Sequence, residues 1–278
     1  MKDTKWLAVG IVLGLVAPLR ALPAQDDEAA VSRKRLALME QTIASFVVKS
    51  DQIAAADRLK FPGVPLLRYS DPTRGTTEEN VLIDATVWRL GAQGRPTGLV
   101  TLEIYRSTAE TGILAYEFSS FVSDRFSLSG KTSAAVVWEA AGSALTLRPL
   151  GGAPPPARTA ATRLVQLRQL ARRFTVRETL KGDTIECRLL TAPLDRYQAS
   201  ADGIEDGALF AFANGTNPEV VVALECGPKS WTYGLARLSA AETAVHLDGR
   251  EVMHYDKVDN ARLRGDFTSR IERIELPK

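Results

Sequence analysis

The sequence predicts an α+β protein of two duplicated modules, each an amphipathic helix packed on an antiparallel β-meander. Three observations lead to this class. The pentapeptide PLLRY, at Pro65, returns as PLDRY at Pro193. A helix-like stretch precedes each copy, and alternating strand-like stretches follow it. The matches keep one order along the chain, which favours a copied unit over chance resemblance.

The first matched stretch has the periodicity of a helix. RLALMEQTIASFVV, from Arg35, aligns with RLVQLRQLARRFTV, from Arg163. Thr159 suits the N-cap of the second helix. Apolar residues recur at spacings of three and four, which place them on one stripe that must pack against a sheet: Leu36, Met39, Ile43 and Phe46 in the first copy, and Leu164, Leu167, Ala171 and Phe174 in the second.

The second matched stretch has the alternation of strands. DATVWRLGAQGRPTGLVTLE, from Asp84, aligns without a gap with DGALFAFANGTNPEVVVALE, from Asp206. Apolar and polar residues alternate in LVTLEIYR, which predicts a sheet with one buried and one wetter face. NGTNP predicts a hairpin loop, and VHLDGREV predicts a second hairpin that turns at Asp248–Gly249. We expect Asp84 and Asp206 to cap the turns before their strands.

The N-terminus has the pattern of a signal peptide. Lys2 and Lys5 precede an apolar run from Trp6 to Leu19, which is short for a membrane span. We therefore expect an exported protein, periplasmic or extracellular, that is not an integral membrane protein after cleavage. The expected organisation is a signal peptide (1–24), a first α+β module (25–150), a Pro/Gly linker (151–157), a second α+β module (158–255) and an exposed, charged C-terminal extension (256–278).

Composition excludes several classes of function. The formal net charge is +2, which gives no overall attraction to nucleic acid. The sequence contains no G-x-S-x-G, no P-loop and no HExxH, and it offers no cofactor signature. These observations favour a protein that is not an enzyme and that carries no cofactor.

Residues present in both copies indicate structure before chemistry, because a fold determinant must recur and a catalytic site need not. We predict that Arg68 reaches Glu103 across neighbouring strands, and that Arg196 reaches Glu225 in the same way.

The two cysteines, Cys187 and Cys226, fall at apolar positions of the first copy, so we expect both to be buried. In an exported protein, such a pair is a disulfide candidate. A simple meander would instead insert the strand at 207–213 between them and leave free thiols. The sequence leaves both outcomes open.

Two further groups are candidates for chemistry. The expected register sets Glu103 opposite Glu117, and two close carboxylates can perform glycosidase-type acid–base catalysis. The alternative is a wet sheet face crowded with arginines. His246 and His254 invite a metal site, but a two-residue turn pairs His246 with Glu251 and puts His254 on the opposite face. A bulged turn would restore one face; surface histidines are the favoured interpretation.

The second helix and the residues beside it are strongly basic. They can meet an anionic surface, or they can simply form the solvated side of a packed helix. The residues are Arg158, Arg168, Arg172, Arg173 and Arg177.

Several phrases carry a resemblance to a known family. PLLRYSDPTRG, DATVWRLGAQGRP, LARRF, PLDRY and DGALFAFANGTNPEV together resemble a family of uncharacterised exported proteins of planctomycete-type bacteria. The resemblance covers most of the chain after the signal region. It implies a cell-envelope setting and no assigned activity.

These expectations combine into one leading hypothesis. The chain is expected to be an exported, non-enzymatic binding or interaction protein of the cell envelope, with an envelope ligand or protein partner bound between the two modules. One alternative is a hydrolase of envelope polymers that uses Glu103 and Glu117. The other is attachment to an anionic surface through the basic segment 158–181.

Overall fold

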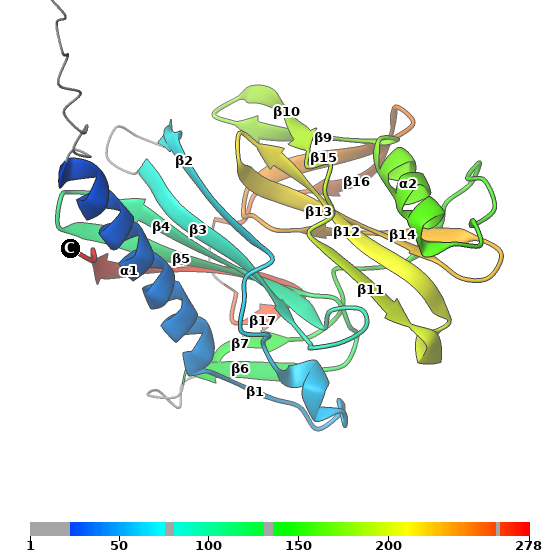
Figure 1. The fold of residues 1–278 in the computed structure, drawn as a ribbon, viewed down its shortest axis with the longest axis horizontal. Helices are drawn as coiled ribbons and strands as arrows, with labels where there is room; N and C mark the ends of the chain where they lie inside the picture. The colour runs from blue at the N-terminus through cyan, green and yellow to red at the C-terminus, as the bar shows by residue number, and fades with distance from the viewer. Residues whose placement is uncertain (1–22, 76–80, 131–135, 260–261) are drawn as a thin grey trace, which may run out of the picture.

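The predicted α+β class is wrong, because the protein is mostly β. The computed structural model describes residues 23–75, 81–130, 136–259 and 262–278. Strands make up 51% of the chain and helices 16%, in three sheets that include a curled antiparallel half-barrel (Figure 1). The strands extend well beyond two short meanders, and the two α-helices only cover sheet faces.

The first sheet has five antiparallel strands in the order β18-β5-β4-β3-β2. Met39 and Ile43 of the helix α1 are buried against Trp88 and Leu102 of this sheet. Figure 1 shows α1 lying diagonally across the sheet's outer face. The elements are α1 (Pro23–Ser45), β2 (Leu67–Gly75), β3 (Val81–Leu90), β4 (Gly98–Arg106), β5 (Thr111–Ser120) and β18 (Phe267–Glu275).

The second sheet follows the order β16-β15-β9-β10-β12-β13-β14-β8, and β11 pairs with β12 beside this path. The helix α2 covers its outer face through Leu167, Leu170 and Ala171. Its elements are β8 (Arg148–Pro149), α2 (Ala160–Ala171), β9 (Phe174–Leu180), β10 (Asp183–Leu189), β11 (Asp195–Ala199), β12 (Ile204–Asn214), β13 (Asn217–Cys226), β14 (Trp231–Arg237), β15 (Glu242–Leu247) and β16 (Arg250–Tyr255).

A third, smaller sheet lies beside the first, in the order β1-β6-β7-β17. Phe126 and Trp138 bury one of its faces against the core under α1. Its strands are β1 (Phe46–Lys49), β6 (Phe126–Gly130), β7 (Val136–Ala140) and β17 (Arg264–Gly265). Short 3₁₀ turns, η1 (Ala56–Leu59) and η2 (Ser200–Asp202), complete the described elements.

The two large sheets share a core, formed by the faces that their helices do not cover. Val87 and Leu99 of the first sheet pack in one cluster with Leu209 and Val221 of the second. Every residue of β13 is buried, as are the first seven of β4. The order of layers is therefore helix, sheet, sheet, helix, and the central strands are covered on both faces.

The local turn signals in the sequence were informative. Thr159 caps α2 by accepting a hydrogen bond from the backbone N–H of Thr162 at 3.2 Å, as expected. The hairpin at Asp248–Gly249 is confirmed, and both residues have the positive φ that a tight primed turn requires. The hairpin loop between β12 and β13 is confirmed as well.

The C-terminal segment is not the exposed extension that the sequence suggested. Strand β18 pairs with β5 along its whole length, from Phe267 opposite Ser119 to Glu275 opposite Thr111. Phe267, Thr268 and Leu276 are buried. The segment was misjudged because its charged residues occupy an edge strand, where one face and one edge stay in water.

A buried aspartate ties each helix to its sheet, in the same way in both halves. Asp84 accepts hydrogen bonds from Arg68 at 2.6 and 2.9 Å and from Arg35 of α1 at 3.3 Å. In the second half, Asp206 accepts from Arg196 at 2.6 and 2.8 Å and from Arg163 of α2 at 3.0 Å. Here we call each set an Arg–Arg–Asp bracket. Neither aspartate is the turn cap that we expected.

The brackets predict a large loss of stability for Asp206→Ala. The Asp206 side chain is 1% exposed, so its removal leaves two arginines without their shared carboxylate. We expect a loss of about 3–5 kcal/mol in the free energy of unfolding, measured by urea denaturation. Asp57→Ala is the control, because Asp57 pairs with Lys60 at the surface; about 1 kcal/mol or less is expected there. Equal losses in the two variants would refute this role.

Candidate functional site

An acidic cavity lies where the two large sheets meet. Its volume is about 610 Å³. Side chains from both sheets line it, together with the segments after β14 and β16. Four glutamates that are at most 8% exposed take part. The lining includes Glu103, Tyr105, Glu117, Glu178, Lys181, Asn217, Glu219, Ser239, Ala240, Ala241, Glu242 and Lys257.

Glu103 stands at the centre of a buried hydrogen-bond network. The Tyr69 hydroxyl donates to its Oε1 at 2.8 Å, and the Tyr105 hydroxyl donates to its Oε2 at 2.7 Å. Tyr69 also lies 3.0 Å from the Oδ1 atom of Asn217, which belongs to the second sheet. Burial and the neighbouring Glu103 raise the pKa of Tyr69 well above its usual value, so it remains a phenol and a donor.

Glu117 lies beside Glu103, but not directly opposite. Glu117 pairs with Thr101 across the strands and Glu103 pairs with Ala115, so the two glutamates are diagonal neighbours and the expected register is wrong. The backbone N–H of Ala240 donates to Glu117 at 2.9 Å. Burial raises the pKa of Glu117 well above the ordinary carboxyl range, and the negative fields of Glu103 and Glu219 add to this.

The second sheet supplies the opposite wall. Glu178 accepts a hydrogen bond from the Asn214 side-chain amide at 2.6 Å, and Glu219 accepts one from the Ser239 hydroxyl. Neither glutamate was singled out from the sequence. A signal was present for Glu178, since it follows Phe174 and Val176 on the buried face of FTVRETL.

The corresponding corner of the second half is built differently. Tyr197 donates to Glu225 at 2.7 Å, as Tyr69 donates to Glu103. Arg95, from the first half, also binds both oxygens of Glu225 at 2.6 Å. In the alignment of the two copies, Asn217 occupies the position of Arg95. The side-chain amide of Asn217 therefore lies near Glu103 at one corner, whereas the guanidinium of Arg95 binds Glu225 at the other corner.

The predicted Arg–Glu pairs are therefore wrong. Arg68 does not pair with Glu103, and Arg196 does not pair with Glu225; each arginine binds the aspartate of its bracket. The glutamates are instead bonded to tyrosines. Asp84 and Asp206 lie within β3 and β12 and bind these arginines, in place of the expected role as turn caps.

The cysteines are both buried and free, so the disulfide is not formed. Strand β12 lies between β10, which carries Cys187, and β13, which carries Cys226. The intervening strand keeps the two thiols apart, as a simple meander predicts. Burial raises the pKa of Cys226 to about 11, which keeps its thiol protonated and unreactive.

The histidines do not form a metal site within the part of the chain that the structure describes, where no group of three potential ligands has suitable geometry. His246 pairs with Glu251 as expected. A bulge at Val245/His246, the exception that the sequence left open, shifts the register so that His254 pairs with Ala244. The Nε2 atom of His254 lies 3.6 Å from Oε1 of Glu242 and 3.7 Å from Oδ1 of Asp256.

The basic segment is only partly available as a surface. Arg158, Arg168, Arg172 and Arg177 are exposed. Arg173 instead binds Asp248 and the Gly151 carbonyl oxygen. Attachment to an anionic surface therefore stays a prediction. Of the helices that the structure describes, none is long and apolar enough to cross a membrane.

Comparison with known proteins gives no family for this chain: it matches no protein-family model, no curated protein and no solved structure. The fold and the cavity define a mostly β protein with an acidic cavity lined by both large sheets.

The raised pKa of Glu117 predicts how stability depends on pH. Between the ordinary carboxyl pKa and the raised value, the folded chain holds a proton that the unfolded chain has released, so stability falls as pH rises. Glu117→Gln removes this dependence. Relative to the unmodified chain, we expect the free energy of unfolding of the variant to increase by up to about 1.4 kcal/mol for each pH unit in that range.

The measurement is urea denaturation from pH 5 to pH 8. Glu186→Gln, at an exposed position of β10, serves as the control and should show no gain. If the difference in free energy of unfolding between Glu117→Gln and the unmodified chain stays constant with pH, the raised pKa of Glu117 is contradicted.

Proposed function

We propose that the protein is an exported binding protein, and that the acidic cavity between the two sheets is its ligand site. The observation that carries this proposal is the convergence of buried polar groups from both sheets on one cavity. At about 610 Å³, the cavity has the size of a small-molecule site. Export rests on the signal-peptide pattern at 1–24, of which residues 1–22 lie outside the described part of the chain.

The chemistry of the walls favours a ligand that donates hydrogen bonds. Five of the lining residues are glutamates, whose carboxylate oxygens accept hydrogen bonds when ionised. Glu117 differs, because its raised pKa favours the protonated carboxylic acid, which can also donate. A small ligand with several hydroxyl or ammonium groups complements this lining.

Two buried hydroxyls lie on strands next to glutamates of the cavity. Among the described residues, Thr101 and Thr243 each carry an Oγ1 atom with no hydrogen-bond partner, and both side chains are 1% exposed. Thr101 pairs across the strands with Glu117, and Thr243 pairs with Glu178. Each unsatisfied buried hydroxyl costs about 1–3 kcal/mol, but neither threonine lines the cavity.

The proposal predicts binding of a small amino sugar. Glucosamine and glucose are the probes, measured by calorimetry at pH 7, and we expect glucosamine to bind more tightly because the cavity is acidic. Ala241→Trp places a large side chain on the cavity wall and should abolish binding. Ala161→Trp, on the exposed face of α2, should leave binding unchanged. No binding of either sugar at millimolar concentration, or unchanged binding by Ala241→Trp, would contradict the proposal.

A hydrolase is the second candidate, because Glu103 and Glu117 line the same cavity. Glu117, with its raised pKa, would be the general acid. Glu103 is less suited to be a nucleophile, since tyrosine hydroxyls bind both of its oxygens. The test is hydrolysis of aryl glycosides; activity that falls about 100-fold or more in Glu117→Gln would favour the hydrolase.

A further inference from the structure

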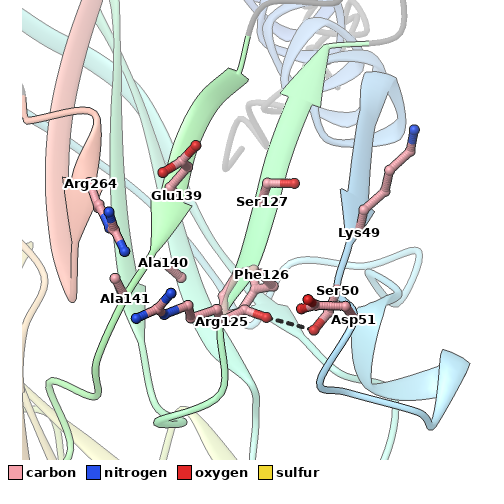
Figure 2. Close-up of a pocket in the computed structure, with 10 residues that line it drawn as sticks. All are labelled: Lys49, Ser50, Asp51, Arg125, Phe126, Ser127, Glu139, Ala140, Ala141 and Arg264. Atoms are coloured by element: carbon pink, nitrogen blue, oxygen red, sulfur yellow. Dashed lines mark hydrogen bonds between the residues drawn. The ribbon is translucent and has the colours of Figure 1, made fainter.

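The exposed face of the third sheet carries a groove that is separate from the acidic cavity. Its volume is about 460 Å³, and Figure 2 shows its lining. No residue lines both sites. The lining consists of Lys49, Ser50, Asp51, Arg125, Phe126, Ser127, Glu139, Ala140, Ala141 and Arg264.

Strand pairing places four of these side chains in one row. Lys49 pairs with Ser127, Ser127 pairs with Glu139, and Glu139 pairs with Arg264. The row therefore crosses the sheet from one outer strand to the other. Residues that face each other across strands project from the same face, so these side chains all reach the groove.

The guanidinium groups of Arg125 and Arg264 converge at one end of the groove. Figure 2 shows both pointing toward Ala140 and Ala141, whose small side chains leave space between them. The Glu139 carboxylate points away from this space in the same view. Both arginines are exposed, and within the described chain no salt bridge engages either guanidinium.

We propose that this groove binds the oxyanion of a small ligand, a carboxylate or a phosphate, between Arg125 and Arg264. Two convergent guanidinium groups repel each other, and an oxyanion between them accepts charge-assisted hydrogen bonds from both. The site differs in sign from the acidic cavity, so it takes a different chemical class of ligand.

The two acidic residues of the lining restrict the ligand further. Asp51 and Glu139 also line the groove, so a chain of successive negative charges would meet like charge within it. A ligand with one anionic group, and with hydroxyl or ammonium groups elsewhere, fits both ends. The Ser50 hydroxyl is already committed, because it donates to the Arg125 carbonyl oxygen at 2.6 Å and fixes the loop before β6.

The test compares single anions with a neutral sugar and a polyanion. Glucuronate and glucose 6-phosphate supply the carboxylate and the phosphate, and their relative affinities identify which oxyanion the site prefers. Glucose lacks the anionic group and should not bind the groove. Polyglutamate tests the exclusion of successive charges. Affinities are measured by calorimetry at low salt on the Ala241→Trp variant, in which the acidic cavity is blocked.

Arg125→Gln and Arg264→Gln should each weaken binding of the preferred monoanion at least about tenfold. Arg250→Gln, at an exposed arginine of β16, should leave it unchanged. In the unmodified chain, the backbone amide resonances of Ser127 and Ala141 should shift on titration with the same monoanion. The proposal would be overturned if neither monoanion bound at millimolar concentration. It would also be overturned if the glutamine variants bound the monoanion with unchanged affinity, or if polyglutamate bound more tightly than the monoanions.

Discussion

The structure depends on the burial of both faces of its central strands. Strand β4 carries Leu102 toward α1 and Leu99 toward the other sheet, and β13 carries Val222 toward α2 and Val221 toward the first sheet. Such strands cannot keep one face in water, so the polar residues of their inner faces are enclosed as well. Buried polar groups must find partners. This constraint produces the tyrosine–glutamate pairs and, where the fit between the sheets is incomplete, the acidic cavity.

The two halves satisfy this constraint through reciprocal loops. The loop after β3 brings Arg95 to Glu225, and the loop after β12 brings Asn217 to Tyr69. Arg95 and Asn217 occupy the same position in the aligned copies, and each contacts a residue of the opposite half. The Arg–Arg–Asp brackets also repeat in both halves. These correspondences support the duplication hypothesis, which remains a prediction. The change from a guanidinium at one corner to an amide at the other makes the two corners chemically different, and the cavity lies at the amide corner.

Local features were predictable from the sequence, and assembly was not. The stripe that contains Met39, the cap at Thr159 and the turn at Asp248–Gly249 all depend on neighbouring residues. The fold class is wrong because the strands extend well beyond two short meanders, and the alternation in LVTLEIYR does not mark a wet face. Thr101 and Glu103 are buried under a second sheet, which lies far away in sequence. Likewise, β18 pairs with β5 across most of the chain, and no local pattern specifies that partner. Of the candidate site, Glu103 and Glu117 were identified, whereas Glu178 and Glu219 required the packing of the sheets.

The most direct test of this face-to-face packing is a disulfide across the interface. A Cβ atom built on Gly94, in the loop after β3, would lie 3.4 Å from the Cβ atom of Ala199 at the end of β11. This is close to the separation of about 3.5–4.5 Å that a disulfide needs. A variant with Gly94→Cys and Ala199→Cys should therefore cross-link under mild oxidation, as shown by mass spectrometry of a peptide pair joined through these positions. If the folded variant keeps both new thiols free while each single variant also folds, the two sheets do not meet as described.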